Sequence, residues 1–245
     1  FRLAQLPIAG LRSDGIEMYD LLVRMLDEQG NSVLPSEFLP AAERSNMMKN
    51  IDRWMIKAAI KFCEESEADR VFVRLSRQSV LDKTTIAWMD QEFDKTSFDC
   101  TRLVMQIPER DAAKHIKQTR ALVGGLKKLG VAFALEHYGV DQERFQILDM
   151  LKPDYIKIDG ELMHSLMTER SMQASVERIV AAARQRNIRT VAERVENANA
   201  MAVLFQLGLD YMQGHYVHEP EVVLQDKTDS VKKRTLEELA AANAG

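Results

Sequence analysis

Short apolar runs alternate with longer amphipathic stretches along most of the chain. The runs predict buried strands, because short apolar segments bounded by turn residues are typical of strands. The amphipathic stretches repeat apolar residues at helical spacing and predict helices with one buried face. In chain order, we expect strands at 3–11, 19–26, 71–76, 103–108, 131–135, 155–158, 190–192 and 211–213. We expect one helix with Ser36 as its N-cap, and others at 46–62, 112–129, 143–150, 171–185 and 198–207.

The order of these elements predicts an α/β barrel. The first two strands flank the turn signal Ser13-Asp14-Gly15 and are expected to form an antiparallel hairpin. From there strands alternate with helices, which implies parallel strands covered on both faces. The repeat favours a single-domain, modified TIM-like (β/α)8 barrel with an antiparallel first strand. A doubly wound open sheet is the alternative, and it is disfavoured because no Gly-rich phosphate loop follows the first strand.

Composition narrows the class of partner. The 245 residues, 46% of them hydrophobic, are ample for one large core. The net charge of −4 predicts no bulk attraction to nucleic-acid polymers or anionic membranes, so an anionic ligand needs local Arg or Lys groups. No apolar run approaches ~18 residues, so we expect no membrane insertion. Cys63 and Cys100 form no motif and are expected to be reduced thiols in a cytoplasmic protein. Residues 226–245 are rich in charge and predict a frayed tail or a short surface helix.

Polar residues stand where the predicted strands end. In a barrel the carboxyl ends of the parallel strands converge on one face. We therefore expect these side chains to gather at one mouth of the barrel. The residues are Asp20, Arg74, Gln106, Glu136, His137, Lys157, Glu193 and Gln213.

Several segments resemble, in order and at family spacing, the EAL domains, which bind and cut the bacterial second messenger cyclic di-GMP. Residues 19–24 resemble the Glu-Ala-Leu-Leu-Arg signature, and Asp52-Arg53-Trp54 matches its Asp-x-Trp. Residues 152–159 resemble the strand that bears the catalytic lysine. Residues 191–196 and 207–214, with Glu219-Pro220, resemble the C-terminal motifs. The likeness covers residues 3–220 and implies an EAL-like domain over 1–225.

The resemblance also exposes departures at the metal positions. Active members hold two divalent cations with carboxylates and an Asn, and the cations generate the attacking hydroxide. Here Asp20 replaces a Glu, Arg74 replaces the Asn, and Gln106 replaces a Glu. Glu136 and His137 replace an Asp-Asp pair, and imidazole is a poor ligand for Mg²⁺. We therefore expect no metal requirement and absent or very slow hydrolysis. The vestigial catalytic positions are Asp20, Gln106, Glu136, His137, Lys157 and Glu196.

A second set of residues matches family positions in the nucleotide cleft. Arg24 is expected to hold a phosphate, because a guanidinium forms bidentate, charge-assisted bonds. Arg74 is expected to occupy part of the metal volume and neutralise a ligand phosphate. Arg194 replaces a Gly and could stack on a guanine or contact a phosphate; a solvated side chain is the alternative. Structural alternatives are an Asp20–Arg24 ion pair and a Lys157 held only by neighbouring acids. The complete set is Leu22, Arg24, Pro35, Asp52, Arg74, Glu193, Arg194, Gln213, Gly214 and Pro220.

Within this family, residues 7–11 and 19–30 most resemble the FimX-like receptors of type IV pilus assembly and twitching motility. That likeness implies a cytoplasmic signalling domain, at the cell pole, that docks a PilZ-domain protein. Three hypotheses follow. The first is a metal-independent cyclic di-GMP receptor, the second is a weak Mg²⁺- or Mn²⁺-dependent phosphodiesterase that makes pGpG, and the third is an interaction module that no longer binds nucleotide.

Overall fold

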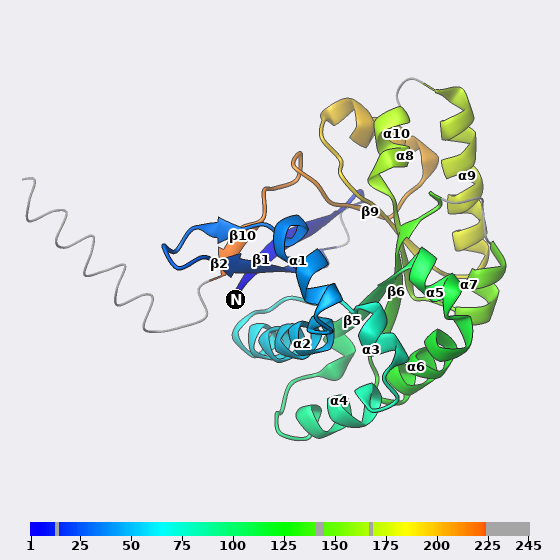
Figure 1. The fold of residues 1–245 in the computed structure, drawn as a ribbon. Helices are drawn as coiled ribbons and strands as arrows, with labels where there is room; N and C mark the ends of the chain where they lie inside the picture. The colour runs from blue at the N-terminus through cyan, green and yellow to red at the C-terminus, as the bar shows by residue number, and fades with distance from the viewer. Residues whose placement is uncertain (13–14, 141–144, 167–168, 224–245) are drawn as a thin grey trace, which may run out of the picture.

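The computed structural model describes residues 1–12, 15–140, 145–166 and 169–223. Eight strands close into a barrel surrounded by helices (Figure 1). Strand β1 is antiparallel to both neighbours, β2 and β9, and every other neighbouring pair is parallel. The predicted barrel with an antiparallel first strand is therefore confirmed. Its strands are β1 (Arg2–Gly10), β2 (Met18–Leu26), β4 (Arg70–Arg74), β5 (Leu103–Pro108), β6 (Ala132–Tyr138), β7 (Tyr155–Ile158), β8 (Arg189–Ala192) and β9 (Tyr211–Met212).

Two short strands extend the hairpin of β1 and β2. Strand β3 (Ser32–Val33) pairs with the end of β2, and β10 (Glu221–Val223) pairs with the start of β1. The remaining elements are α1 (Pro35–Arg44), α2 (Met48–Glu65), α3 (Arg77–Leu81), α4 (Thr85–Phe93), a 3-10 turn (Cys100–Arg102), α5 (Glu109–Lys114), α6 (Ile116–Lys128), α7 (Phe145–Leu151), α8 (Gly160–Ser165), α9 (Arg170–Gln185) and α10 (Ala198–Leu207).

The apolar residues fall into two layers. The larger layer lies between the outer face of the strands and the inner faces of the helices, as the helical spacing requires. The smaller layer fills the inside of the barrel, so the barrel is a packed core without a pore. Phe72 belongs to this inner layer and meets Tyr155 edge to face, with 5.1 Å between ring centroids. The polar residues of the mouth lie directly above this inner apolar layer.

Two expectations about helices are wrong. The single helix expected at 112–129 is two helices, because the chain breaks at His115, whose φ and ψ are −121° and 41°. Ser36 is not an N-cap: Leu34 holds that position and Pro35 opens α1, where its missing N–H costs nothing. The Glu37 carboxylate accepts the Leu34 N–H at 2.8 Å. Helices α3, α4 and α8 and strand β10 were not expected.

Two other expectations concern the environment. Cys63 and Cys100 are free thiols, as predicted. Among the helices of the described residues, none has the length and apolar character needed to cross a membrane. The tail predicted at 226–245 lies outside the described residues.

Candidate functional site at the barrel mouth

A cleft of about 230 Å³ lies at the mouth where the strand ends converge. It brings together most of the residues that the strand-end rule and the family likeness had singled out. Apolar side chains from β1, α1 and α2 form one wall, and they include Leu6, Leu39, Met48 and Met55. The predicted residues that line the cleft are Asp20, Leu22, Pro35, Asp52, Arg74, Gln106, Glu136, His137, Glu193 and Gln213.

One half of the mouth is a buried network around Asp20. Lys157 Nζ lies 2.6 Å from Asp20 Oδ2, and Gln106 Nε2 donates to Asp20 Oδ1 at 2.8 Å. Gln213 Nε2 adds a longer bond of 3.4 Å to Oδ2. The Lys157 side chain has no exposed surface, and its Nζ lies 5.0 Å from the centre of the Phe72 ring. Asp20 is therefore neutralised by a protein cation, and Lys157, not Arg24, is its ionic partner.

The other half is built around Arg74 and opens to solvent. Arg74 Nε donates to Glu136 Oε1, and Arg74 Nη2 lies 2.6 Å from His137 Nε2. Glu136 is buried, whereas 47% of the Arg74 side chain is exposed. The Glu136 carboxylate raises the pKa of Arg74 above its already high value, so the guanidinium stays charged. Arg74 thus presents a permanent cation at the rim of the cleft.

His137 links Arg74 to two further carboxylates. Its Nδ1 lies 2.8 Å from Asp159 Oδ2 and 3.2 Å from Glu193 Oε2. The interaction with Glu193 is the largest cause that raises the pKa of His137, to about 8, while burial and the Arg74 charge oppose the rise. Its backbone φ of +52° lies in the left-handed region, which is uncommon for a residue other than glycine. The ligand atoms of His137, Asp159 and Glu193 lie within 4.8 Å of one another, so this trio is the candidate cation site among the described residues.

Asp159 caps a helix and also faces the mouth. Its Oδ1 accepts the Glu161 N–H at 2.7 Å at the start of α8, while Oδ2 faces His137. A cap motif in the sequence gives no sign of the second contact, because His137 lies on a different strand. Asp159 is therefore a residue of the mouth that sequence reasoning missed.

Asp52 joins α2 to the segment after β4. Its Oδ2 accepts the Ser76 N–H at 2.9 Å and the hydroxyls of Ser76 and Ser79 at 2.5 Å each. Burial raises the pKa of Asp52, and these hydrogen bonds oppose the rise. Asp52 therefore fixes the start of α3 against α2, and its serine partners were not anticipated.

Two buried amide oxygens of the mouth have no hydrogen-bond partner among the described residues. They are Oε1 of Gln106 and Oε1 of Gln213, on side chains whose amide nitrogens both face Asp20. A buried acceptor without a partner is costly and points to a missing donor. Both oxygens are closed to solvent, so a ligand with N–H or O–H groups would reach them only after these side chains moved.

Comparison with known proteins places the chain in a family. The family described as "EAL domain" matches residues 1–220. The chain belongs to the EAL family. This EAL domain is 33% identical to the FimX EAL domain from Pseudomonas aeruginosa, solved bound to c-di-GMP, with a TM-score of 0.86 and 90% of each chain covered. The Xanthomonas citri FimX EAL domain, 24% identical with a TM-score of 0.83 over 92% of this chain and 89% of that one, shares the fold. The prediction of a FimX-like EAL domain is confirmed.

Some of the curated relatives bear enzyme names. The cyclic di-GMP phosphodiesterase PdeF of Escherichia coli (strain K12) is 28% identical over 228 residues, which are 91% of this chain and 30% of that protein. The cyclic di-GMP phosphodiesterase PdeB of Shewanella oneidensis is 27% identical over 220 residues, which are 88% of this chain and 26% of that protein. The EAL domain thus spans less than a third of the length of these two relatives.

The other predicted residues of the EAL domain lie outside the lining of the cleft. Arg24 is half-buried, its Nη1 donates to the Val23 carbonyl at 3.1 Å, and burial lowers its pKa. Arg194 is exposed, with φ +54°, and its side chain lies on Gly160, where an added Cβ would come within 2.4 Å of Arg194 Cδ. Arg194 and Glu196 line a neighbouring hollow of about 400 Å³. Lys157, Gly214 and Pro220 complete this group.

Gly214 has a structural reason to be glycine. Its φ is +146°, and a Cβ there would lie 2.4 Å from the backbone nitrogen of Val195. The same Val195 N–H donates to the Gln213 carbonyl at 3.0 Å. This close backbone contact holds the segment after β8 against the segment after β9, and so fixes Glu193 relative to Gln213.

Proposed function

We propose that this EAL domain binds cyclic di-GMP at the mouth without a divalent cation, leaves the nucleotide intact, and relays the signal by contact with another protein. One observation carries the proposal: the protein's own side chains already engage the carboxylates of the mouth. Lys157 neutralises Asp20, Arg74 neutralises Glu136, and His137 lies against Glu193.

These residues fit a pair of Mg²⁺ ions poorly. Mg²⁺ needs several oxygen ligands in near-octahedral geometry. Gln106 presents its N–H₂ group, not its oxygen, to Asp20, and Arg74 presents N–H donors where the family has an Asn. Seating two cations would require Asp20 and Glu136 to exchange their ion pairs for metal bonds while Lys157 and Arg74 remained beside the metals. The like charges oppose that exchange.

The same groups suit an anionic nucleotide. The exposed guanidinium of Arg74 can neutralise a ligand phosphate through charge-assisted hydrogen bonds. Gln106 and Gln213 line the cleft, and their amide oxygens can accept from guanine N–H or ribose O–H groups once these side chains turn toward it. The wall around Leu39 and Met48 offers apolar surface for a base. Similarity to the P. aeruginosa FimX EAL domain solved with c-di-GMP supports this choice of ligand.

The finer biological role rests on likeness to FimX alone. We propose that the domain acts in the cytoplasm, at the cell pole, in type IV pilus biogenesis and twitching motility, with a PilZ-domain protein as partner. Size-exclusion chromatography of the domain with a PilZ-domain protein, with and without cyclic di-GMP, tests the partner. Co-elution supports it, and separate elution under both conditions rejects it.

The alternative function is a weak Mg²⁺- or Mn²⁺-dependent phosphodiesterase that makes pGpG. The names of the relatives PdeF and PdeB favour it, and so does the trio of His137, Asp159 and Glu193, which could hold one cation. Prolonged incubation of the domain with cyclic di-GMP and each metal, followed by chromatography of the nucleotide, separates the two. Intact nucleotide supports the receptor, and accumulation of pGpG that EDTA stops supports the enzyme.

A further inference from the structure

The end of the barrel opposite the mouth has two adjoining hollows. One, of about 480 Å³, lies between the end of β1, α9 and the segment before β9. The other, of about 610 Å³, lies beneath the starts of β6 and β7. Asn187 and Arg189 line both, so the hollows adjoin at these two residues, and we call the two hollows together the base groove. TIM-like barrels place their chemistry at the other end, so the base groove is separate from the nucleotide cleft.

The lining of the base groove is positive, whereas the chain as a whole is negative. The whole chain has a net charge of −4, yet the groove is lined by five cationic side chains and two carboxylates. The two carboxylates are occupied: Asp210 Oδ2 accepts the Thr190 N–H at 2.9 Å, and Asp154 Oδ2 accepts the Phe133 N–H at 2.9 Å. The cations are Arg12, Arg70, Lys127, Arg184 and Arg189.

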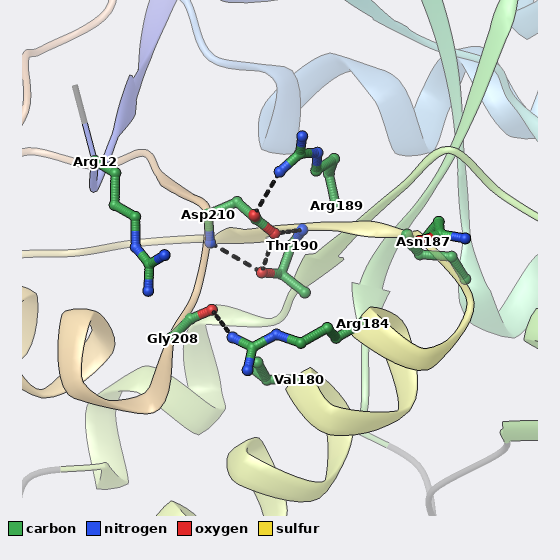
Figure 2. A pocket seen from close by; sticks show the side chains of 9 residues that line it. Arg12, Val180, Arg184, Asn187, Arg189, Thr190, Gly208 and Asp210 are labelled. Carbon is green, nitrogen blue, oxygen red and sulfur yellow. Dashed lines mark hydrogen bonds and ion pairs between the residues drawn. The ribbon is translucent and has the colours of Figure 1, made fainter. Parts of the chain in front are cut away.

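The arginines keep donors free for a ligand. Arg12 and Arg184 approach the first hollow from opposite sides (Figure 2). Arg184 uses Nη2 for the Gly208 carbonyl at 3.0 Å, and Arg189 uses Nη1 for Asp210 Oδ1 at 3.0 Å, which leaves the other guanidinium N–H groups of both side chains available. Arg12 lies 5.9 Å above the Phe205 ring and has no carboxylate partner among the described residues. Guanidinium groups arranged in this way suit planar carboxylates.

We infer that the base groove is a docking surface for an extended, acidic segment of a partner protein. Cations occur at both ends, with Arg12 in the first hollow and Lys127 in the second, and Arg189 stands where the hollows join. An extended segment with several Asp or Glu residues meets all three positions, whereas one small anion fills a single hollow. Complementary charge sets the specificity and association rate of such a contact.

Glycine amide signals provide a direct test. The chain has 11 glycines; Gly208 lines the first hollow, Gly130 lines the second, and Gly214 lies at the mouth. A synthetic oligo-glutamate peptide is titrated into the ¹⁵N-labelled domain. We expect the Gly130 and Gly208 amides to shift together with one affinity, Gly214 to stay in place, and the affinity to fall as NaCl is added. A Gly-Ser peptide of the same length should shift none of them.

Charge-reversal variants locate the contact. Arg12→Glu and Lys127→Glu change one exposed cation at each end, and each should weaken peptide binding about fivefold. Lys83→Glu, an exposed cation outside the groove, is the matched control and should bind as the unaltered domain does. Peptide binding that neither variant weakens would overturn the inference, as would the absence of glycine shifts. Pyrophosphate that shifts only one of the two glycines while the peptide shifts neither would replace the docking surface with a small-anion site.

Discussion

The two halves of the barrel mouth use the same kinds of charge for different purposes. Asp20 and Lys157 form an almost fully buried pair, with Gln106 and Gln213 filling the remaining positions around the carboxylate. Arg74 pairs with a buried Glu136, but nearly half of its own side chain remains exposed. The difference teaches that a residue at a vestigial catalytic position can become part of the core or can turn toward a ligand. Solvent access, more than residue type, decides which of these two roles the residue takes.

The largest effect is expected from breaking the buried half. Lys157→Met leaves the Asp20 carboxylate buried beside two amides without a cation. We expect a loss of about 3–5 kcal/mol in the free energy of unfolding, measured by urea denaturation. The double variant Asp20→Asn/Lys157→Met should recover much of that loss, because it removes both charges. A single-variant loss below about 1 kcal/mol, typical of exposed pairs, would show that this half is not a buried pair in solution.

The exposed half should affect the ligand more than the fold. Arg74→Ala is expected to weaken cyclic di-GMP binding about 10- to 100-fold in calorimetry, as the loss of a charge-assisted hydrogen bond does. Arg77→Ala is the matched control, since Arg77 pairs with the exposed Glu43 at 3.1 Å. Arg74→Ala also leaves the buried Glu136 carboxylate without its cationic partner. The double variant Arg74→Ala/Glu136→Gln removes that charge as well, so it should fold well and still bind weakly. Unchanged affinity in that double variant would remove Arg74 from the ligand site.

A pH titration sharpens the role of His137, which touches Arg74. The pKa of His137 is raised to about 8, so the imidazole gains its proton as the pH falls through that value. The groups that face it are Arg74, Glu136, Asp159 and Glu193. A proton on Nε2 ends its role as acceptor for Arg74 and adds a positive charge beside the cleft.

Affinity for the anionic nucleotide should therefore rise severalfold as the pH falls through about 8. The stability contribution has the same sign: a folded-state pKa above the ordinary 6.5 stabilises the fold at low pH, and that contribution is lost as the pH rises through about 8. His137→Gln should flatten the affinity profile. A profile that keeps its shape in this variant would assign the pH dependence to another group.

The smallest effect is expected at Arg194. Its exposed side chain lies on Gly160 and lines the neighbouring hollow, not the cleft. Arg194→Ala should weaken cyclic di-GMP binding by no more than about threefold, as exposed contacts do. A loss as large as that of Arg74→Ala would mean that Arg194 swings over the bound nucleotide.

Most of the fold could be predicted because its signals are local. The strands at 103–108 and 155–158 and the helix at 198–207 were placed at their observed bounds, since each has a distinct apolar pattern and clear ends. The break at His115 was missed because helical spacing continues across it. Strand β10 was missed because it depends on pairing with β1, more than two hundred residues earlier in the chain.

The candidate site, like the fold, could be predicted only in part from the sequence. Its members could be gathered from strand ends and family positions, because the barrel brings those ends together. Two sets of partners could not be predicted, because each depends on side-chain orientation in the folded state. They are Asp20 with Lys157, 137 residues apart in the chain, and Asp52 with Ser76 and Ser79. Only the structure divides the mouth into a buried and an exposed half.

The most direct measurement is calorimetric titration of cyclic di-GMP into the domain in EDTA and again in excess Mg²⁺, with the nucleotide analysed afterwards. If the protein's own cations neutralise the ligand, affinity is the same in both buffers and the nucleotide is recovered whole. Binding that appears only with Mg²⁺, accompanied by linear pGpG, would contradict that account.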